Sequence, residues 1–106
     1  MVTRASITAL LLLLPLTVRA AVTLTGADGK TLTLAAPATR IVSLAPDLTE
    51  LVYAAGAGET LVGASAYSDY PAAAKQLPHI GDAFRVDTER LLALRPDLVL
   101  AWQGGT

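Results

Sequence analysis

The chain has 106 residues, of which 53% are hydrophobic and 16% are charged, and its formal net charge is −1. It is not basic enough to follow a phosphate backbone, so nucleic acid is set aside as a partner. It has no cysteine and a single histidine, His79, which leaves carboxylates to supply most ligands of any protein-bound metal. A resident metal centre is therefore not expected.

The first twenty residues have the pattern of a secretory signal peptide. Arg4 precedes an apolar run from Ile7 to Leu16, and small residues follow at the position where cleavage is expected. The run is well short of the roughly 20 residues that cross a bilayer, so cleavage after Ala20 is favoured over an uncleaved membrane anchor. The predicted organisation is a signal peptide over 1–20 and a mature region over 21–106, which is either a compact single domain or, as the Gly-Gly-Thr ending directly after a strand favours, a part of something larger.

Residues 22–34 predict a β-hairpin, because apolar and polar side chains alternate on both sides of an Asp28-Gly29 turn. A linker containing Pro37 leads into RIVSLAP, residues 40–46. The continuous apolar core of that segment is typical of a strand buried on both faces of a sheet.

A helix is predicted next, over 48–55. Asp47 is the candidate N-cap, Glu50 stands three residues later as in a capping box, and Gly56 supplies the C-terminal stop. The apolar residues at helical spacing are Leu48, Leu51, Val52 and Ala55. A second strand, LVGAS, is predicted at 61–65.

The remainder predicts a helical stretch at 72–76, a loop at 77–84, a helix capped by Asp87 or Thr88, and a buried strand at 97–102. The leucines of that last helix expected to face inward are Leu91, Leu92 and Leu94. Strands alternate with helices along the chain. The predicted fold class is therefore α/β, with a parallel sheet, helices on both faces and right-handed crossovers, preceded by the hairpin.

Ligands of open parallel sheets bind beyond the carboxyl ends of the strands. Two of the segments that leave these ends carry large aromatic residues: AYSDYP at 66–71 and the stretch that begins at Trp102. Aromatic rings with polar tips suit a large, flat, partly polar ligand, and ligand contact is predicted for Tyr67 and Trp102. Tyr70, held extended before Pro71, is predicted to pack beneath its loop and to give its hydroxyl to the backbone.

The acidic residues have structural explanations. Asp69 suits a turn cap and Asp82 a Gly-Asp turn, and neither has a second carboxylate at helical spacing that would make a catalytic pair. Glu89 lies in the first turn of the last helix, where the helix dipole favours a negative charge. The serines available for a Ser-His-Asp triad are Ser43, Ser65 and Ser68, but there is no G-x-S-x-G elbow, and no phosphate loop is present.

The segment RIVSLAPDLTELVYAAGAGETLVGAS resembles the opening strand, helix and second strand of the periplasmic substrate-binding proteins of ABC importers that carry metal chelates: cobalamin, haem and ferric siderophores. AYSDYP, followed at its distance by ERLLALRPDLVLAW and Gly-Gly, is similar to the cobalamin-binding branch. The resemblance covers residues 40–106. It implies the N-terminal lobe of a two-lobe, helix-linked protein that holds its ligand between the lobes, and the chain is interpreted as truncated, with the second lobe missing.

The resemblance also implies roles. Tyr67 matches the loop tyrosine that lies against the corrin, Trp102 matches the tryptophan at the end of the third strand, and Glu89 matches the glutamate that pairs with arginines of the membrane permease. Phe84 stands beside Ala83, where cobalamin binders often have a second tryptophan, and is expected to act as an apolar wall. The predicted support of the tyrosine loop consists of Asp69, Tyr70 and Pro71.

The resemblance thus implies a periplasmic protein without catalysis or a cofactor of its own, whose partners are a cobalamin-like ligand and the permease. A haem- or ferric-siderophore-binding protein of the same fold is the alternative. A small secreted α/β enzyme or interaction domain using Asp69, Asp82 and His79 is the alternative of another class.

Overall fold

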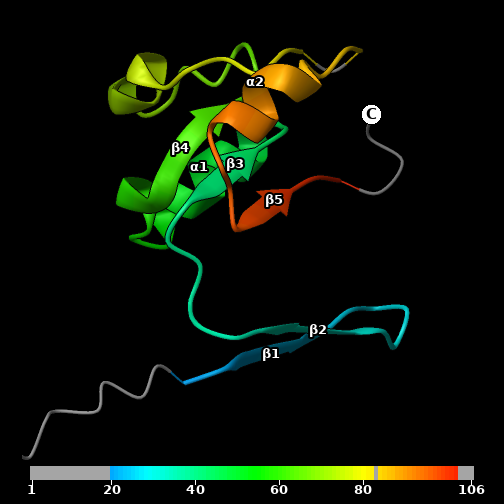
Figure 1. The fold of residues 1–106 in the computed structure, drawn as a ribbon. Helices are drawn as coiled ribbons and strands as arrows, with labels where there is room; N and C mark the ends of the chain where they lie inside the picture. Colours follow the sequence, from blue (N-terminus) through cyan, green and yellow to red (C-terminus); the bar gives the residue numbers. More distant parts are fainter. Residues whose placement is uncertain (1–19, 83, 103–106) are drawn as a thin grey trace, which may run out of the picture.

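The computed structural model describes residues 20–82 and 84–102 (Figure 1). The predicted signal peptide up to residue 19 and the Gly-Gly motif at 104–105 lie outside these residues. None of the helices in the described ranges has the length and apolar character needed to cross a membrane.

The predicted hairpin is confirmed. Strands β1 (Val22–Thr25) and β2 (Thr31–Leu34) pair antiparallel as a separate two-stranded sheet. At the turn, Gly29 has a φ of 79°, and the Asp28 carboxylate accepts a hydrogen bond of 2.9 Å from the Lys30 N–H. Asp28 and Gly29 therefore close the turn as the sequence predicts.

The main sheet is parallel and has the strand order β4-β3-β5. Its strands are β3 (Ile41–Ser43), β4 (Leu61–Ala64) and β5 (Leu98–Leu100). The central strand β3 is buried throughout, as expected from its continuous apolar sequence. The prediction that the last strand is buried is wrong, because β5 lies at the sheet edge and Val99 is exposed.

Helices cover both faces of this sheet, which confirms the predicted α/β class. Figure 1 shows α2 (Thr88–Ala93) in front of the sheet and α1 (Pro46–Ala54) behind it. Crossovers of the same hand produce this arrangement, because the chain passes from β3 to β4 in one direction and from β4 back to β5 in the other. The right-handed sense is the one expected for parallel strands. Two short 3₁₀ helices, η1 (Gly58–Thr60) and η2 (Ala72–Gln76), complete the domain.

The start of α1 differs from the prediction. The N-cap is Ala45, which has no side chain to cap with, and Pro46 occupies the first helical turn, where its missing N–H costs nothing. Asp47 is therefore inside the helix, and the predicted Asp47–Glu50 capping box does not form. The predicted C-terminal stop is confirmed: Gly56 has a φ of 81° and donates to the Tyr53 carbonyl.

The buried face of each helix is narrower than the hydrophobic pattern suggests. In α1 the buried side chains are Thr49 and Val52, whereas Leu51 is exposed. In α2, Asp87 is confirmed as the N-cap through a hydrogen bond of 3.1 Å from the Arg90 N–H. Leu92, which was expected to face inward, is exposed.

The packed centre joins the sheet to α1. Ile41, Val52 and Leu61 form its buried cluster. On the other face α2 approaches the sheet closely, since a Cβ on Gly63 would lie 2.6 Å from a methyl carbon of Leu94. These contacts fix the carboxyl ends of the strands, from which the candidate site is built.

The opposite end of the sheet is held by Asp97. Its carboxylate accepts hydrogen bonds from the Thr39 N–H at 2.8 Å and the Arg40 N–H at 2.9 Å, and these bonds tie the start of β3 to the start of β5. Hydrogen bonds from the Thr39 and Arg40 backbone stabilise the ionised form and lower the pKa of Asp97 below its ordinary value of 3.8.

The Asp97→Asn variant tests this link through its pH dependence. A lowered folded-state pKa gives stability that is present above the unfolded value near 3.8 and is lost as pH falls through the lower folded value. The variant should therefore melt below the wild type at pH 7, and the difference should shrink below pH 3.8. Thermal unfolding by circular dichroism measures it. Asp69→Asn, at an exposed carboxylate, is the control, and an equal pH-dependent difference there would contradict the assignment.

Candidate functional site

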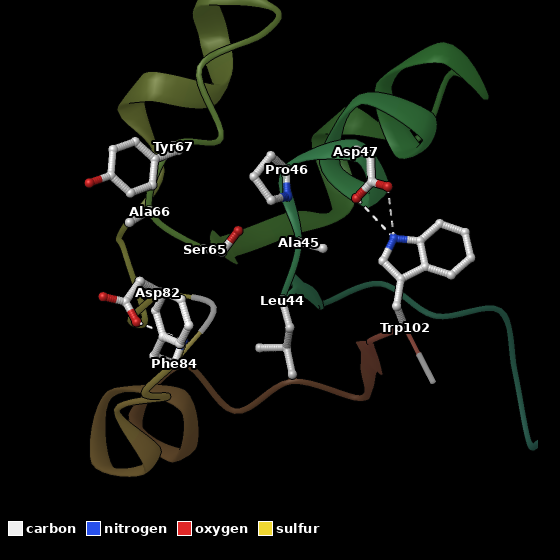
Figure 2. Close-up of a pocket in the computed structure, with 10 residues that line it drawn as sticks. All are labelled: Leu44, Ala45, Pro46, Asp47, Ser65, Ala66, Tyr67, Asp82, Phe84 and Trp102. Carbon is white, nitrogen blue, oxygen red and sulfur yellow. Dashed lines mark hydrogen bonds between the residues drawn. The ribbon is translucent and has the colours of Figure 1, made fainter. Parts of the chain in front are cut away.

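A pocket of about 360 Å³ lies beyond the carboxyl ends of the three parallel strands, where the sequence predicts the ligand rim (Figure 2). It is formed by segments that follow β3, β4 and β5, together with the loop before α2. Its lining residues are Leu44, Ala45, Pro46, Asp47, Ser65, Ala66, Tyr67, Asp82, Phe84 and Trp102. The fold therefore brings together residues that are up to 58 positions apart in the chain.

Three aromatic side chains surround the pocket. Tyr67, Phe84 and Trp102 are 78%, 97% and 48% exposed, and Figure 2 shows them on different segments around an apolar floor that includes Leu44 and Pro46. These are the three residues that the sequence assigns to the ligand. Their gathering at one pocket agrees with that assignment.

Trp102 is held in place by α1. Its indole Nε1–H donates to the Asp47 carboxylate, with both oxygens 2.9 Å from the nitrogen (Figure 2). Asp47 thus orients an aromatic wall of the pocket from the first turn of the helix. Sequence reasoning missed this role because it read Asp47 only as a helix cap, and no local pattern links two residues that are 55 positions apart.

The loop that carries Tyr67 is anchored by a chain of buried hydroxyl groups. Ser65 and Ser68 lie 3.1 Å apart, Ser68 lies 3.0 Å from Thr49 of α1, and Thr49 donates to Ser43 of β3 at 2.9 Å. Ser43 donates to the Ala45 carbonyl at 2.9 Å. All four hydroxyls are satisfied, so the chain connects the loop, the helix and the central strand without leaving a buried polar atom unpaired.

This hydroxyl chain gives the serines a structural role. Tyr67 lies between Ser65 and Ser68 and has a φ of 67°, a left-handed conformation that is uncommon for tyrosine. The two buried serines hold the backbone on either side of it and leave the ring at the surface. Sequence reasoning considered these serines only as nucleophiles, because no pattern in the sequence marks a small hydroxyl residue as buried.

The predicted loop support by Asp69 and Tyr70 is wrong. Tyr70 is 71% exposed, so its ring does not pack beneath the loop. The buried side chains of this region are instead those of Ser65, Ser68 and Ala74. The carboxylate of Asp69 accepts no hydrogen bond from the described residues; the Asp69 N–H instead donates to the Tyr67 carbonyl at 3.0 Å. Pro71 is the N-cap of η2.

Phe84 is presented by a tight loop, in which the turn role predicted for Asp82 is confirmed. The Asp82 carboxylate accepts hydrogen bonds from the Phe84 N–H at 2.8 Å and the Arg85 N–H at 3.0 Å. Gly81, with a φ of 121°, pairs with Val86 across the base of the loop. The loop therefore holds an apolar ring in solvent with no packing of its own.

The remaining candidates lie outside this pocket. Glu89 is exposed in the first turn of α2, and His79 is exposed at an isolated bridge to Ala64. Within 20–82 and 84–102, no three His, Cys, Asp or Glu side chains form a group that could hold a metal ion. Among these residues, neither a catalytic triad nor a metal centre is assembled from the enzyme candidates Asp69, Asp82 and His79.

This α/β lobe has exposed aromatic rings around a pocket at the carboxyl edge of its sheet. That architecture is typical of ligand-binding domains. The chain belongs to the periplasmic binding protein family, whose model matches residues 41–106. The predicted family is thereby confirmed. The match begins at the first residue of β3 and leaves out the hairpin.

Known relatives support this membership. The vitamin B12-binding protein of Yersinia pestis (strain Pestoides F) is 57% identical over 68 residues, which are 64% of this chain and 24% of that protein. The chain thus spans about a quarter of the length of the curated relatives it matches.

Solved structures give the same result. The periplasmic vitamin B12 binding protein of Vibrio cholerae is 48% identical with a TM-score of 0.63, over 66% of this chain and 28% of that one. A periplasmic heme binding protein from Pseudomonas aeruginosa is 42% identical with a TM-score of 0.57, over 58% and 22%. All of these relatives are named as binding proteins.

Proposed function

We propose that this chain is the ligand-binding lobe of the solute-binding component of an ABC importer, and that its pocket receives one face of a cobalamin-like metal chelate in the periplasm. The observation that carries the proposal is the gathering of Tyr67, Phe84 and Trp102 around one pocket. Family membership favours binding over the alternative of a small secreted enzyme.

The geometry suits a broad, flat ligand. Exposed aromatic rings have their faces in water, and a ligand that covers them gains the free energy of removing that apolar surface. The pocket volume of about 360 Å³ is within the usual range for small-molecule sites, but the pocket is open on one side. A macrocycle larger than the pocket would therefore lie across its mouth, with its edge in solvent.

Delivery to a permease is the second part of the proposal. Glu89 is exposed on α2 and is not among the lining residues of the aromatic pocket, so its carboxylate can meet a cationic partner while a ligand is bound. An arginine of the permease is the complementary group, since a guanidinium and a carboxylate form a directed, charge-assisted pair. Glu89 is accordingly proposed as a docking residue.

Haem is the second candidate ligand. It is favoured by the 42% identity to the solved heme binding protein and by the exposed Tyr67, because a tyrosine oxygen is one of the protein groups that can hold haem iron. Cobalamin and haem are both flat macrocycles, so the aromatic rings alone do not discriminate between them.

Equilibrium dialysis against cobalamin and against haem tests the proposal, with the macrocycle's own visible absorbance as the readout. Trp102, the single tryptophan of the chain, provides a second readout, since a macrocycle over its ring should quench its fluorescence. Saturable binding of cobalamin in preference to haem supports the proposal, and the reverse preference supports the second candidate. If neither ligand binds, the function proposed here is wrong.

Tyr67→Ala should weaken macrocycle binding about tenfold, since loss of a rigid aromatic contact at the centre of an interface costs on the order of 1–2 kcal/mol. The thermal midpoint should stay unchanged, because the ring is exposed. Tyr70→Ala is the matched control: it removes an equally exposed ring from the same loop but from outside the pocket lining. Equal losses of affinity in the two variants would contradict the role of Tyr67.

A further inference from the structure

A second groove, with charged residues in its lining, adjoins the aromatic pocket. It has a volume of about 340 Å³ and shares Ala66 and Asp82 with the pocket, while its other lining residues include His79, Arg85, Asp87 and Arg90. The two hollows are therefore neighbours on one surface. A ligand larger than the aromatic pocket would reach from one into the other.

Most charges in this groove already have partners. Arg90 donates to the His79 carbonyl at 3.1 Å and lies 3.6 Å from the Asp87 carboxylate, which also caps α2. The Asp82 carboxylate is occupied by the backbone N–H groups of its own turn. The charges of Arg90, Asp87 and Asp82 are therefore paired within the protein, and their bonds stabilise the segments that line the groove.

Arg85 is different. Its guanidinium makes no hydrogen bond or ion pair within 20–82 and 84–102, whereas its backbone is fixed by the Asp82 carboxylate and by the Asp82 N–H, which donates to the Arg85 carbonyl at 3.0 Å. The side chain is thus an available cation on a constrained backbone. Its position directly after Phe84 matters, since Phe84 lines the aromatic pocket and Arg85 lines the groove.

We infer that the Arg85 groove is a subsite for an anionic side arm of the ligand, a carboxylate or a phosphate, whose flat ring system lies in the aromatic pocket. This inference rests on the proposed function and adds to it the charge of the ligand's periphery. A guanidinium offers paired N–H donors that match the geometry of both anions. Because Phe84 and Arg85 are adjacent on one loop, Phe84 can contact the ring system of the ligand while Arg85 binds its anionic side arm.

The test measures the binding of two pairs of macrocycles by dialysis, using the wild type and Arg85→Gln. Haem and its dimethyl ester differ in free carboxylates, and cobalamin and cobinamide differ in the nucleotide arm that carries the phosphate. Arg85→Gln should weaken binding of the member that carries the anionic arm about three- to tenfold, a size set by the solvent exposure of the contact. It should leave binding of the member that lacks this arm unchanged, and added salt should reduce the difference.

Arg95→Gln is the matched control, because it removes the same charge just after α2, next to the Asp97 end of the sheet, and should change neither affinity. A loss confined to haem identifies carboxylate arms, and a loss confined to cobalamin identifies the phosphate. If Arg85→Gln binds both members of each pair as the wild type does, or weakens both equally, the subsite is wrong while the proposed function stands. If the wild type binds no macrocycle, both fail.

Discussion

Replacing Gly81 by alanine should destabilise the domain by roughly 3 kcal/mol or more and should remove macrocycle binding. Gly81 has a φ of 121°, a conformation that side chains rarely adopt, and this backbone strain alone costs about 1–3 kcal/mol. A Cβ there would also overlap the carbonyl oxygen of Arg85, which is backbone and cannot rotate away. The loop that carries Phe84 and Arg85 would have to open.

Gly56→Ala is the control that separates the cost of backbone strain from the cost of the overlap with Arg85. Gly56 also has a positive φ, 81°, but a Cβ at that position meets no atom within 4 Å. Gly56→Ala should therefore cost only about 1 kcal/mol and leave ligand binding intact. Urea denaturation gives both free energies of unfolding. If Gly81→Ala proves no worse than Gly56→Ala, then the overlap with Arg85 is relieved easily and the loop is not held as described.

The order of elements followed from the sequence because each was marked locally. The Asp28-Gly29 turn, the apolar run that becomes β3 and the stop at Gly56 need only neighbours in the chain to be recognised. Alternation of strands with helices then implied the parallel sheet. The burial of β5 was misjudged because an apolar run looks the same at the edge of a sheet as at its centre.

The position of the candidate site could be predicted from the sequence, but the contacts that orient its aromatic rings could not. Aromatic residues after strand ends were enough to place Tyr67 and Trp102 at one rim, since parallel strands end on the same edge. What orients these rings depends on contacts between distant residues. Asp47 holds Trp102 across 55 positions, and Thr49 reaches Ser68 across 19, and neither distance leaves a pattern in the sequence.

Tyr70 shows that a local argument can also give a wrong prediction. A tyrosine before a proline was assigned to the interior on a local argument, yet the space beneath the loop is taken by the small polar side chains of Ser65 and Ser68. Small hydroxyl residues can be buried when they satisfy one another, and a sequence gives no direct sign that they do. The error therefore came from an argument that considered only the residue before the proline and not the side chains that the fold brings beneath the loop.

Thr49→Val should destabilise the domain by about 2 kcal/mol, which is a large effect for the removal of one oxygen atom. Thr49 is fully buried, and its hydroxyl contacts Ser43, Ser68 and the Ala45 carbonyl. Valine keeps the shape and removes the central link, so the Ser43 and Ser68 hydroxyls each lose a buried partner. Thr33→Val, on the exposed β2 strand, should change stability by less than about 0.5 kcal/mol.

If the hydroxyl chain positions Tyr67, its loss should affect ligand binding as well as stability, which ordinary core packing would not do. If Ser68 holds the Tyr67 loop through Thr49, then Thr49→Val and Ser68→Ala should be non-additive, with a coupling energy of about 1 kcal/mol in a double-mutant cycle. Both single variants should also weaken macrocycle binding at temperatures where they remain folded. Additive costs together with wild-type affinity would mean that the hydroxyls stabilise the core without positioning Tyr67.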